Sequence, residues 1–360
     1  MTLTLDTIEE AIAEIAAGRP VVVVDDEDRE NEGDLIMAAE AATPEWVGFM
    51  VRHTGGVLCV PMLHSDAKRL QLWPMVSEND APLATAFTVS VDVREGLTTG
   101  ISALERSNTV RALADPQAVS DDFVRPGHIF PLIAREGGVL IRTGHTEAAV
   151  DLSRLAGLRP VSLISEIVND DGSIMQGEAL QIFARDHKLK LSSIDDLIAW
   201  RQSRETLVRR VSDEVVETAI GPGRAIVYET SFDSAQHIAM VFGEIGGEKN
   251  ILTRFQREET VADIFNAPGG AITAALERIK AEGKGVIVYL RQGATGVVVA
   301  GEGDGAGSDA ARRDQWREVG LGAQILKDLE INSIRVLSTT ERQYVGLSGF
   351  DVEIEGTEII

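Results

Sequence analysis

The sequence predicts a chain of two domains, each of which combines β-strands with α-helices. Strand-like and helix-like runs alternate over about the first 200 residues, and a second series of such runs begins near Thr206. The 360 residues are 44% hydrophobic, so the chain can form two cores of ordinary size. We therefore expect a first domain over residues 1–204 and a second over residues 205–360.

An amphipathic helix is expected at the N-terminus. Thr7 and Glu10 have the spacing of a capping box, and Ile8, Ile12 and Ile15 recur on one helical face. This stretch lacks a basic leader, and no apolar run in the chain has the length needed to span a bilayer. The sequence therefore predicts a cytoplasmic protein.

The other elements of the first domain follow from periodicity, capping and turn signals. Buried or alternating runs predict strands at residues 21–24, 35–39, 57–60, 86–93, 139–142 and 161–168. Helices are predicted at residues 44–53, 103–114, 146–155, 178–187 and 193–204. The segment RPGHIFP, residues 125–131, is expected to be a turn near the surface, since it contains two prolines and a glycine.

The second domain gives a similar mixture of signals. Strands are predicted at residues 225–228, 237–242, 285–290 and 334–337, and helices at residues 271–282 and 316–329. The stretch from Gly293 to Gly307 is rich in glycine and alanine, which predicts a mobile loop.

The most informative stretch lies between the first two predicted strands. Seven of the ten residues from Asp25 to Asp34 are acidic, and such close like charges repel unless a positive group joins them. A divalent cation or a cationic substrate group would meet this need, and an acidic surface loop is the alternative. An EF-hand does not fit, because its bidentate glutamate would fall on Ala39. Arg29 adds a fork of donors that suits phosphate or carboxylate.

Three further polar features lie near the ends of predicted strands. His128 lies in the RPGHIFP turn, and Glu166 lies inside the apolar run VSLISEIV. Arg142 precedes a glycine turn, after which His145 and Thr146 open a helix; free N–H groups behind an arginine form a phosphate cradle. Each feature has an ordinary alternative, namely a structural histidine, an exposed strand carboxylate and a simple ion pair.

Charge and cysteine content exclude several classes of function. The net charge is −23, which argues against nucleic acid or an anionic membrane as the main partner. Cys59 is the single cysteine, so the chain can form neither an internal disulfide nor a cysteine-based zinc site. The residue types together favour a site for a phosphorylated small molecule and a hard cation, without naming a reaction.

The motifs of the first domain resemble a specific family. They are DDEDRENEGDLIMAAE, RHTGGVLCVPM, TAFTVSVD, TTGISALER, RPGHIFPLIAREGGVLIRTGHTEAAVDL and SEIVNDDG, in this order. This series is similar to 3,4-dihydroxy-2-butanone 4-phosphate synthase of riboflavin biosynthesis, over Met1 to Arg204. The resemblance implies an α+β fold with a mixed sheet and packed helices, a homodimer, and dependence on Mg²⁺ or Mn²⁺. It also implies that ribulose 5-phosphate is converted into formate and a four-carbon dihydroxybutanone phosphate.

The resemblance also implies roles for individual residues. Glu30 and His145 would be the metal ligands, and His128 and Glu166 the catalytic residues. Contacts with the sugar phosphate are implied for Arg29, Glu30, Asp34, Arg142, Thr143, Gly144, His145, Thr146 and Glu166. One departure is Asn108, where the family commonly has threonine.

The second domain resembles GTP cyclohydrolase II through VYET, HIAMVFGEI, GVIVYLRQ, GLGAQILKDL and SIRVLSTT. The three zinc cysteines of that family are absent, and Glu259 stands about where the first would be. Gly293 to Gly296 replace a loop that carries an arginine in the family. We therefore expect no zinc and no opening of GTP. A bifunctional enzyme with unfamiliar ligands and a non-catalytic binding protein are the alternatives, and the intact Glu30 and His128 argue against the latter.

Overall fold

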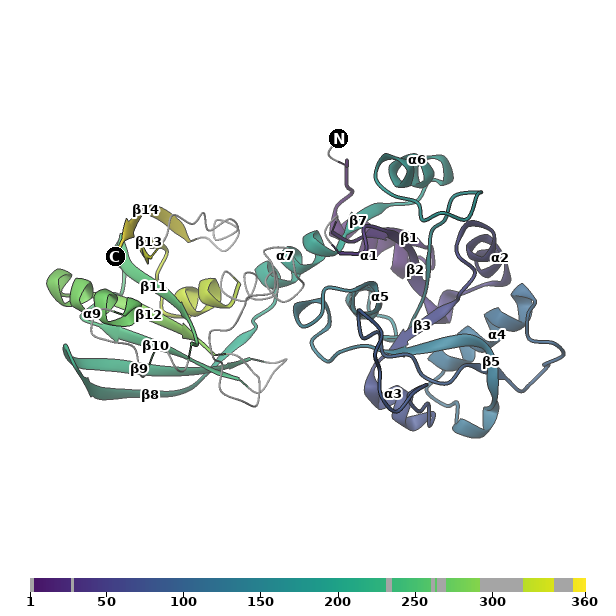
Figure 1. Ribbon diagram of the computed structural model, residues 1–360, viewed down its shortest axis with the longest axis horizontal. Coiled ribbons are helices and arrows are strands. Elements are labelled where there is room, and N and C mark those ends of the chain that lie inside the picture. The colour runs from purple at the N-terminus through teal and green to yellow at the C-terminus, as the bar shows by residue number, and fades with distance from the viewer. Residues whose placement is uncertain are drawn as a thin grey trace. The chain divides into compact units, whose positions relative to one another are not determined.

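The computed structural model divides the chain into two compact units, Met1–Ile198 and Ala199–Ile360. It describes residues 3–26, 29–230, 235–259, 263, 270–291, 320–339 and 352–360. Each unit has one seven-stranded mixed sheet with helices packed against it, which confirms the predicted fold class (Figure 1). The predicted domain boundary after residue 204 falls at the end of α7 (Ile194–Arg204), a helix that begins in the first unit.

The sheet of the first unit has the strand order β4-β5-β3-β6-β2-β1-β7. Its strands are β1 (Val21–Val24), β2 (Gly33–Ala38), β3 (Cys59–Met62), β4 (Val91–Val93), β5 (Phe123–Ile133), β6 (Ser162–Glu166) and β7 (Leu191–Ser193). Its helices are α1 (Ile8–Ala16), α2 (Pro44–His53), α3 (His64–Arg69), α4 (Ala103–Ala114), α5 (His145–Leu155) and α6 (Glu178–His187). The pairs β1–β7 and β3–β5 are parallel, and β1, β2, β6 and β3 pair antiparallel in turn.

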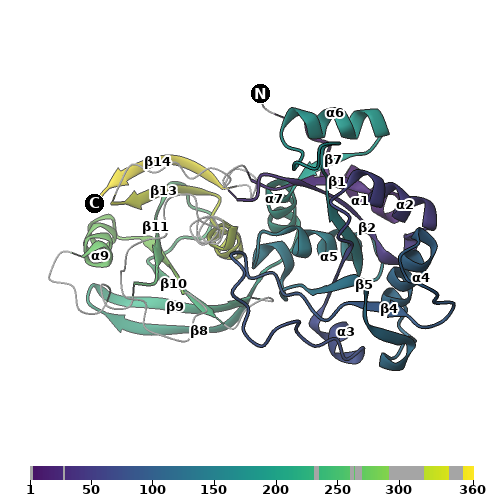
Figure 2. The same cartoon turned by 45° about the vertical axis from the view of Figure 1, so that its right-hand side comes forward.

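Helices cover both faces of this sheet. Val22 and Val24 share a core with Met50 of α2 and Leu113 of α4, and α2 lies beside α4 in Figure 1 and Figure 2. Val21 and Val23 point to the opposite face, where α1 and α5 pack against the strands. All four valines of β1 are buried, as expected for a strand covered on both faces.

Local capping explains where two of these helices start. Thr7 Oγ1 accepts the Glu10 N–H at 3.2 Å, and the Thr7 N–H donates to Glu10 Oε2 at 3.1 Å. The same reciprocal pair joins Ser102 and Glu105 at the start of α4. Both capping boxes were predicted, and both are confirmed.

The predicted strand at residues 139–142 is wrong. Gly138–Leu140 forms a 3-10 turn instead. Gly137 and Gly138 both have positive φ angles, and the Val139 N–H donates to buried Asp151 Oδ2 at 2.9 Å rather than to a neighbouring strand. Asp151 of α5 thus stabilises a tight turn at this point, and the apolar character of residues 139–142 is not enough to make them a strand.

The predicted turn around His128 is also wrong. Residues 125–131 lie inside β5, because the Phe130 N–H donates to Leu58 O at 3.0 Å and Ile129 pairs with Val91 of β4. Two predicted strands differ in extent from those observed. The one at 57–60 begins only at Cys59, and the one at 86–93 is reduced to β4, with isolated bridges before it.

The sheet of the second unit has the order β14-β13-β11-β12-β10-β9-β8. Its strands are β8 (Val208–Thr218), β9 (Gly221–Thr230), β10 (Gln236–Phe242), β11 (Ile251–Arg257), β12 (Gly285–Leu290), β13 (Ser333–Ser338) and β14 (Glu353–Ile359). α9 (Ala271–Glu282) packs on β11 and β12, and residues 320–328 form another helix. The sequence missed β7, β8, β11 and β14. The predicted loop at 293–307 and residues 316–319 lie outside the described residues.

Among the residues that the structure describes, no helix is both long enough and apolar enough to cross a membrane.

Candidate functional site

The acidic run forms the connection of the β1–β2 hairpin, and strand register brings it to two other predicted residues. Asp34 of β2 lies opposite Val23 of β1 on one side and opposite Glu166 of β6 on the other. His145, the first residue of α5, donates from Nε2 to Val23 O at 3.0 Å. Asp34, Glu166 and His145 therefore gather at one end of these strands.

Asp25 organises the described part of the acidic loop. Its Oδ2 accepts Arg29 Nη1 at 2.9 Å and the Glu30 N–H at 3.1 Å, and its Oδ1 accepts the Glu32 N–H at 3.0 Å. The Arg29 side chain is only 3% exposed and also contacts Glu30. Arg29 therefore balances charge inside the loop. Sequence reasoning missed Asp25 as a separate residue, although its place directly after a buried strand was a usable signal.

A cluster of carboxylates surrounds the imidazole of His145. Its Nδ1 lies 3.7 Å from Glu30 and 3.8 Å from Asp34, and the Asp34 Oδ1 is buried without a hydrogen-bond partner in the described part of the chain. Two overlapping sets, one with Asp25 and Glu30 and one with Glu32 and Asp34, bring ligand atoms within 4.8 Å of each other around His145. Carboxylate oxygens with one imidazole suit Mg²⁺ or Mn²⁺, so these residues fit a hard divalent cation.

The pKa values in this cluster are shifted because several acidic groups are buried close together. Burial and the Glu30 charge raise the pKa of Glu32 to about 7, and burial raises the pKa of Asp34 well above its ordinary value. Burial alone would lower the pKa of His145, but the charges of Asp34 and Glu30 outweigh it and raise that pKa to about 9. Burial likewise opposes ionisation of Glu30, whose pKa His145 and Arg29 nevertheless lower. A cation would replace these protons.

The predicted phosphate cradle surrounds the start of α5. Arg142 Nη1 donates to buried Glu147 at 2.7 Å, and Arg142 Nη2 donates to Thr85 Oγ1 at 3.1 Å. A Cβ on Gly144 would lie 2.4 Å from Arg142 Nη1, so only glycine lets the guanidinium lie against the helix start. The ordinary ion pair considered above is therefore present, and it fixes Arg142 beside the free N–H groups of the first turn. Thr143 and Thr146 are buried at this position.

His128 lies apart from the cation cluster within one chain. Phe130 of β5 lies opposite Cys59 of β3, which in turn lies opposite Ile164 of β6. His128 lies two residues before Phe130, and Glu166 lies two residues after Ile164. Both therefore lie at the same end of the strands and face the same side of the sheet. Three strand spacings, about 15 Å, nevertheless separate β5 from β2, which carries the acidic loop. The His128 ring is held by Asp92, which sequence reasoning missed.

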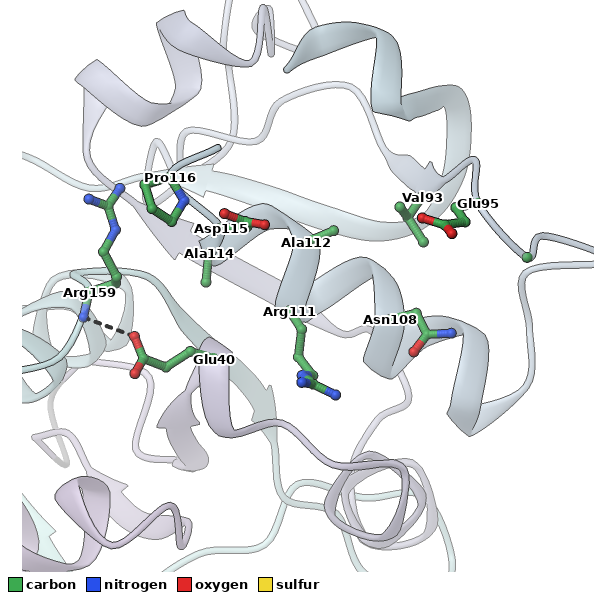
Figure 3. Close-up of a pocket in the computed structure, with 11 residues that line it drawn as sticks. Glu40, Val93, Glu95, Asn108, Arg111, Ala112, Ala114, Asp115, Pro116 and Arg159 are labelled. Atoms are coloured by element: carbon green, nitrogen blue, oxygen red, sulfur yellow. Dashed lines mark hydrogen bonds between the residues drawn. The ribbon is translucent and has the colours of Figure 1, made fainter. Parts of the chain in front are cut away.

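Asn108 lies away from all these residues. It is exposed on α4 and lines an open hollow of about 720 Å³ with Arg111 and Arg159, as Figure 3 shows. Its neighbour Thr109 is buried and accepts the Val93 N–H at 2.9 Å. The departure at residue 108 therefore leaves the contact between α4 and β4 intact. None of the predicted site residues lines this hollow.

The second unit does not fit a zinc ion held by three thiolates. The single cysteine, Cys59, is buried in β3 of the other unit. Glu259, near the expected first cysteine, donates its N–H to Asp263 Oδ2 at 2.8 Å, and the same oxygen accepts the Tyr289 hydroxyl at 2.6 Å. In the described residues, a carboxylate with hydrogen-bond donors around it occupies this region. Residues 293–296 lie outside the described residues.

Comparisons with known proteins agree with this division of the chain. Residues 9–200 match the family described as 3,4-dihydroxy-2-butanone 4-phosphate synthase, and residues 209–358 match the family described as GTP cyclohydrolase II. The riboflavin biosynthesis protein RibBA of Nocardia farcinica is 48% identical over 97% of this chain and 89% of its own, and that of Rhodococcus jostii is 47% identical over the same shares.

Two solved structures extend the comparison. RibBX of A. baumannii, a two-domain 3,4-dihydroxy-2-butanone 4-phosphate synthase, gives a TM-score of 0.83 at 38% identity, over 98% of this chain and 99% of its own. A 3,4-dihydroxy-2-butanone 4-phosphate synthase in complex with two magnesium ions gives a TM-score of 0.54 at 46% identity, over 56% of this chain and 98% of its own.

We expect the affinity for Mn²⁺ or Mg²⁺ to rise from about pH 6 to about pH 9. The cation must displace the protons held by Glu32, with a pKa of about 7, and by His145, with a pKa of about 9. Each displaced proton changes the affinity by about tenfold per pH unit. Titration with Mn²⁺ at several pH values measures this slope. The control variant Asp121→Asn, which changes an exposed carboxylate, should show the same dependence of Mn²⁺ affinity on pH. An affinity independent of pH in the unmodified protein would contradict the assignment of the cluster as a cation site.

Proposed function

The chain belongs to the 3,4-dihydroxy-2-butanone 4-phosphate synthase family and is an enzyme of riboflavin biosynthesis, and from this premise we propose how its residues act on ribulose 5-phosphate. The five carbons of this sugar phosphate are divided between 3,4-dihydroxy-2-butanone 4-phosphate and formate, without an oxidant. The observation that carries the proposal is the carboxylate cluster around His145 beside the helix start of Arg142.

We propose that Glu30 and His145 hold a Mg²⁺ ion, for which Mn²⁺ can substitute. The buried Asp34 oxygen without a hydrogen-bond partner in the described chain and the raised pKa of Asp34 support this choice. So does the related synthase whose structure contains two magnesium ions. When bound, the ion polarises the carbonyl and hydroxyl oxygens of the sugar. Arg29 keeps the loop closed and, with Asp34, forms its polar wall toward the substrate.

Proton transfer is assigned to two residues. Glu166, half-buried at the end of β6 and paired with Asp34, exchanges protons at the sugar carbons beside the carbonyl. His128 supplies the second acid–base group that loss of a hydroxyl and release of formate require. The phosphate lies away from the carboxylates, where Arg142, Thr143 and the N–H groups of Gly144 to Thr146 can bind it.

We propose a homodimer in which one protomer supplies His128 to the cation cluster of the other. A proton-transfer group must come within about 3 Å of its target, whereas about 15 Å separates β5 from β2 in one chain. Gly100 lies against the His128 ring, and exposed apolar residues follow it in the chain: Ile101 and Leu104 are 55% and 57% exposed. An apolar patch of this kind suits a subunit interface.

We propose that the second domain does not open GTP. The reason is the absent thiolates together with the Asp263 network near Glu259. The two-domain synthase from A. baumannii is similar along the whole length of both chains. The alternative, a bifunctional enzyme, is favoured by the match of residues 209–358 to GTP cyclohydrolase II.

The purified full-length protein should release formate from ribulose 5-phosphate when Mg²⁺ is present. Chelation should abolish this activity and added Mg²⁺ should restore it, because the ion polarises the sugar oxygens. Formate and the four-carbon phosphate can be measured by NMR. Full turnover in chelated buffer would overturn the assignment of the cluster as a cation site.

A mixing experiment tests the shared site. Glu30→Ala and His128→Ala should each lower turnover by about a hundredfold or more. After subunit exchange of equal amounts, half of the dimers are mixed and each has one complete site, so activity should recover to roughly a quarter of wild type. If the mixture stays inactive after subunit exchange, His128 and Glu30 of one site come from a single chain.

GTP should be inert with this protein, with or without added Zn²⁺. The reaction of the similar family needs a zinc ion held by three thiolates, and only Cys59 is present. Loss of GTP and formation of formate from GTP measure the outcome. Zinc-stimulated turnover that survives Cys59→Ala would promote the bifunctional alternative.

A further inference from the structure

Asp92 holds His128 with both of its carboxylate oxygens, one at the imidazole and one at the backbone N–H. His128 Nδ1 lies 2.7 Å from Asp92 Oδ2, and the His128 backbone N–H donates to Asp92 Oδ1 at 2.9 Å. Asp92 is only 3% exposed, whereas the His128 side chain is 40% exposed. A carboxylate can only accept, so the Nδ1 atom carries the proton and the Nε2 atom is left as the acceptor. The ring is thus prepared to take a proton at a single atom.

Gly100 closes the space above this hydrogen bond. Its φ angle is +83°, and a Cβ there would lie 2.3 Å from Asp92 Oδ2 and 2.6 Å from His128 Nδ1. No side chain larger than hydrogen fits without moving the pair. On the other side, Ser90 Oγ accepts the Gly127 N–H at 3.2 Å and fixes the strand just before His128.

Arg106 of α4 interacts electrostatically with Asp92. It is 7% exposed, and its Nε is buried without a hydrogen-bond partner in the described part of the chain. Burial lowers the pKa of Arg106, and the charge of Asp92 opposes that effect. A buried cation needs a compensating charge, and Asp92 supplies it across the contact between α4 and β4.

We propose that Asp92 is the positioning residue of His128, and that Arg106 balances the carboxylate charge so that Asp92 can hold the ring. Asp92 from β4 faces the ring, Arg106 from α4 interacts electrostatically with Asp92, and Gly100 covers the contact between Asp92 and the ring. This inference rests on the catalytic role proposed for His128. Carboxylates in this arrangement fix the tautomer and orientation of an imidazole without themselves exchanging a proton.

The first test uses Asp92→Asn in the full-length protein. An amide can donate to Nδ1, which would reverse the tautomer, so we expect kcat for formate release to fall about a hundredfold to ten-thousandfold with KM changed little. Nitrogen NMR of protein with ¹⁵N-labelled histidine should show the Nδ1–H form of His128 in the wild type and its loss in the variant. Mn²⁺ affinity should stay unchanged, since the cation cluster lies on other strands.

A glycine pair provides the matched control. Gly100→Ala and Gly96→Ala impose the same type of backbone strain, because both residues have positive φ, but a Cβ at Gly96 meets nothing within 4 Å. We expect Gly100→Ala to lower kcat at least tenfold further than Gly96→Ala when both fold. Arg106→Met should weaken the Nδ1–H signal, and Arg106→Lys should restore it in part.

The outcomes separate this inference from the function on which it rests. If His128→Ala turns over like wild type, the catalytic assignment itself is wrong. If His128→Ala is inactive while Asp92→Asn keeps wild-type kcat and the same histidine tautomer, the positioning role of Asp92 is refuted and His128 stands. Equal losses in the two glycine variants would refute the close contact of Gly100 with the pair.

Discussion

Mutual repulsion of the carboxylates in the β1–β2 connection is the constraint around which the first unit is arranged. Asp25 fixes the loop through one side chain and two backbone N–H groups, and Arg29 cancels part of its charge. His145 ties the start of α5 to β1 through the Val23 carbonyl and turns its other nitrogen toward the acids. The raised pKa values of Glu32 and Asp34 show that repulsion and burial still disfavour their charged forms. A bound hard cation would stabilise those charged forms.

The two chemical tasks of the site rest on different strands. The cation cluster is supported by β1, β2 and the start of α5, whereas His128, proposed for proton transfer, is held by Asp92 of β4, a strand that α4 contacts through Thr109. Pairing of the exposed ring with a buried carboxylate leaves Nε2 accessible while Nδ1 is fixed. A homodimer would join the two halves without lengthening either chain. The second unit contributes none of these residues.

Local signals in the sequence predicted the capping boxes, the two strands that flank the acidic run and most helices, because their determinants lie within a few residues. The elements that the sequence did not predict depend on tertiary contacts. Val139 turns because Asp151 of a helix captures its N–H, and His128 lies in a strand because β3 and β4 pair with a segment rich in turn residues. Asp25 and Asp92 act through partners that spacing alone does not reveal. Motif resemblance named the candidate reacting residues, and the geometry adds what holds them.

The register of the central strands has an evolutionary consequence. Val23, Asp34 and Glu166 lie directly across from one another, so their backbone positions, rather than any flexible loop, decide that the acids share a face with His145. A slip of β2 by one residue would send Asp34 to the opposite, apolar face and bring Leu35 into its place. Sequences that keep this site can therefore vary the surface helices, whereas an insertion or deletion inside these short strands would misplace Asp34 or Glu166.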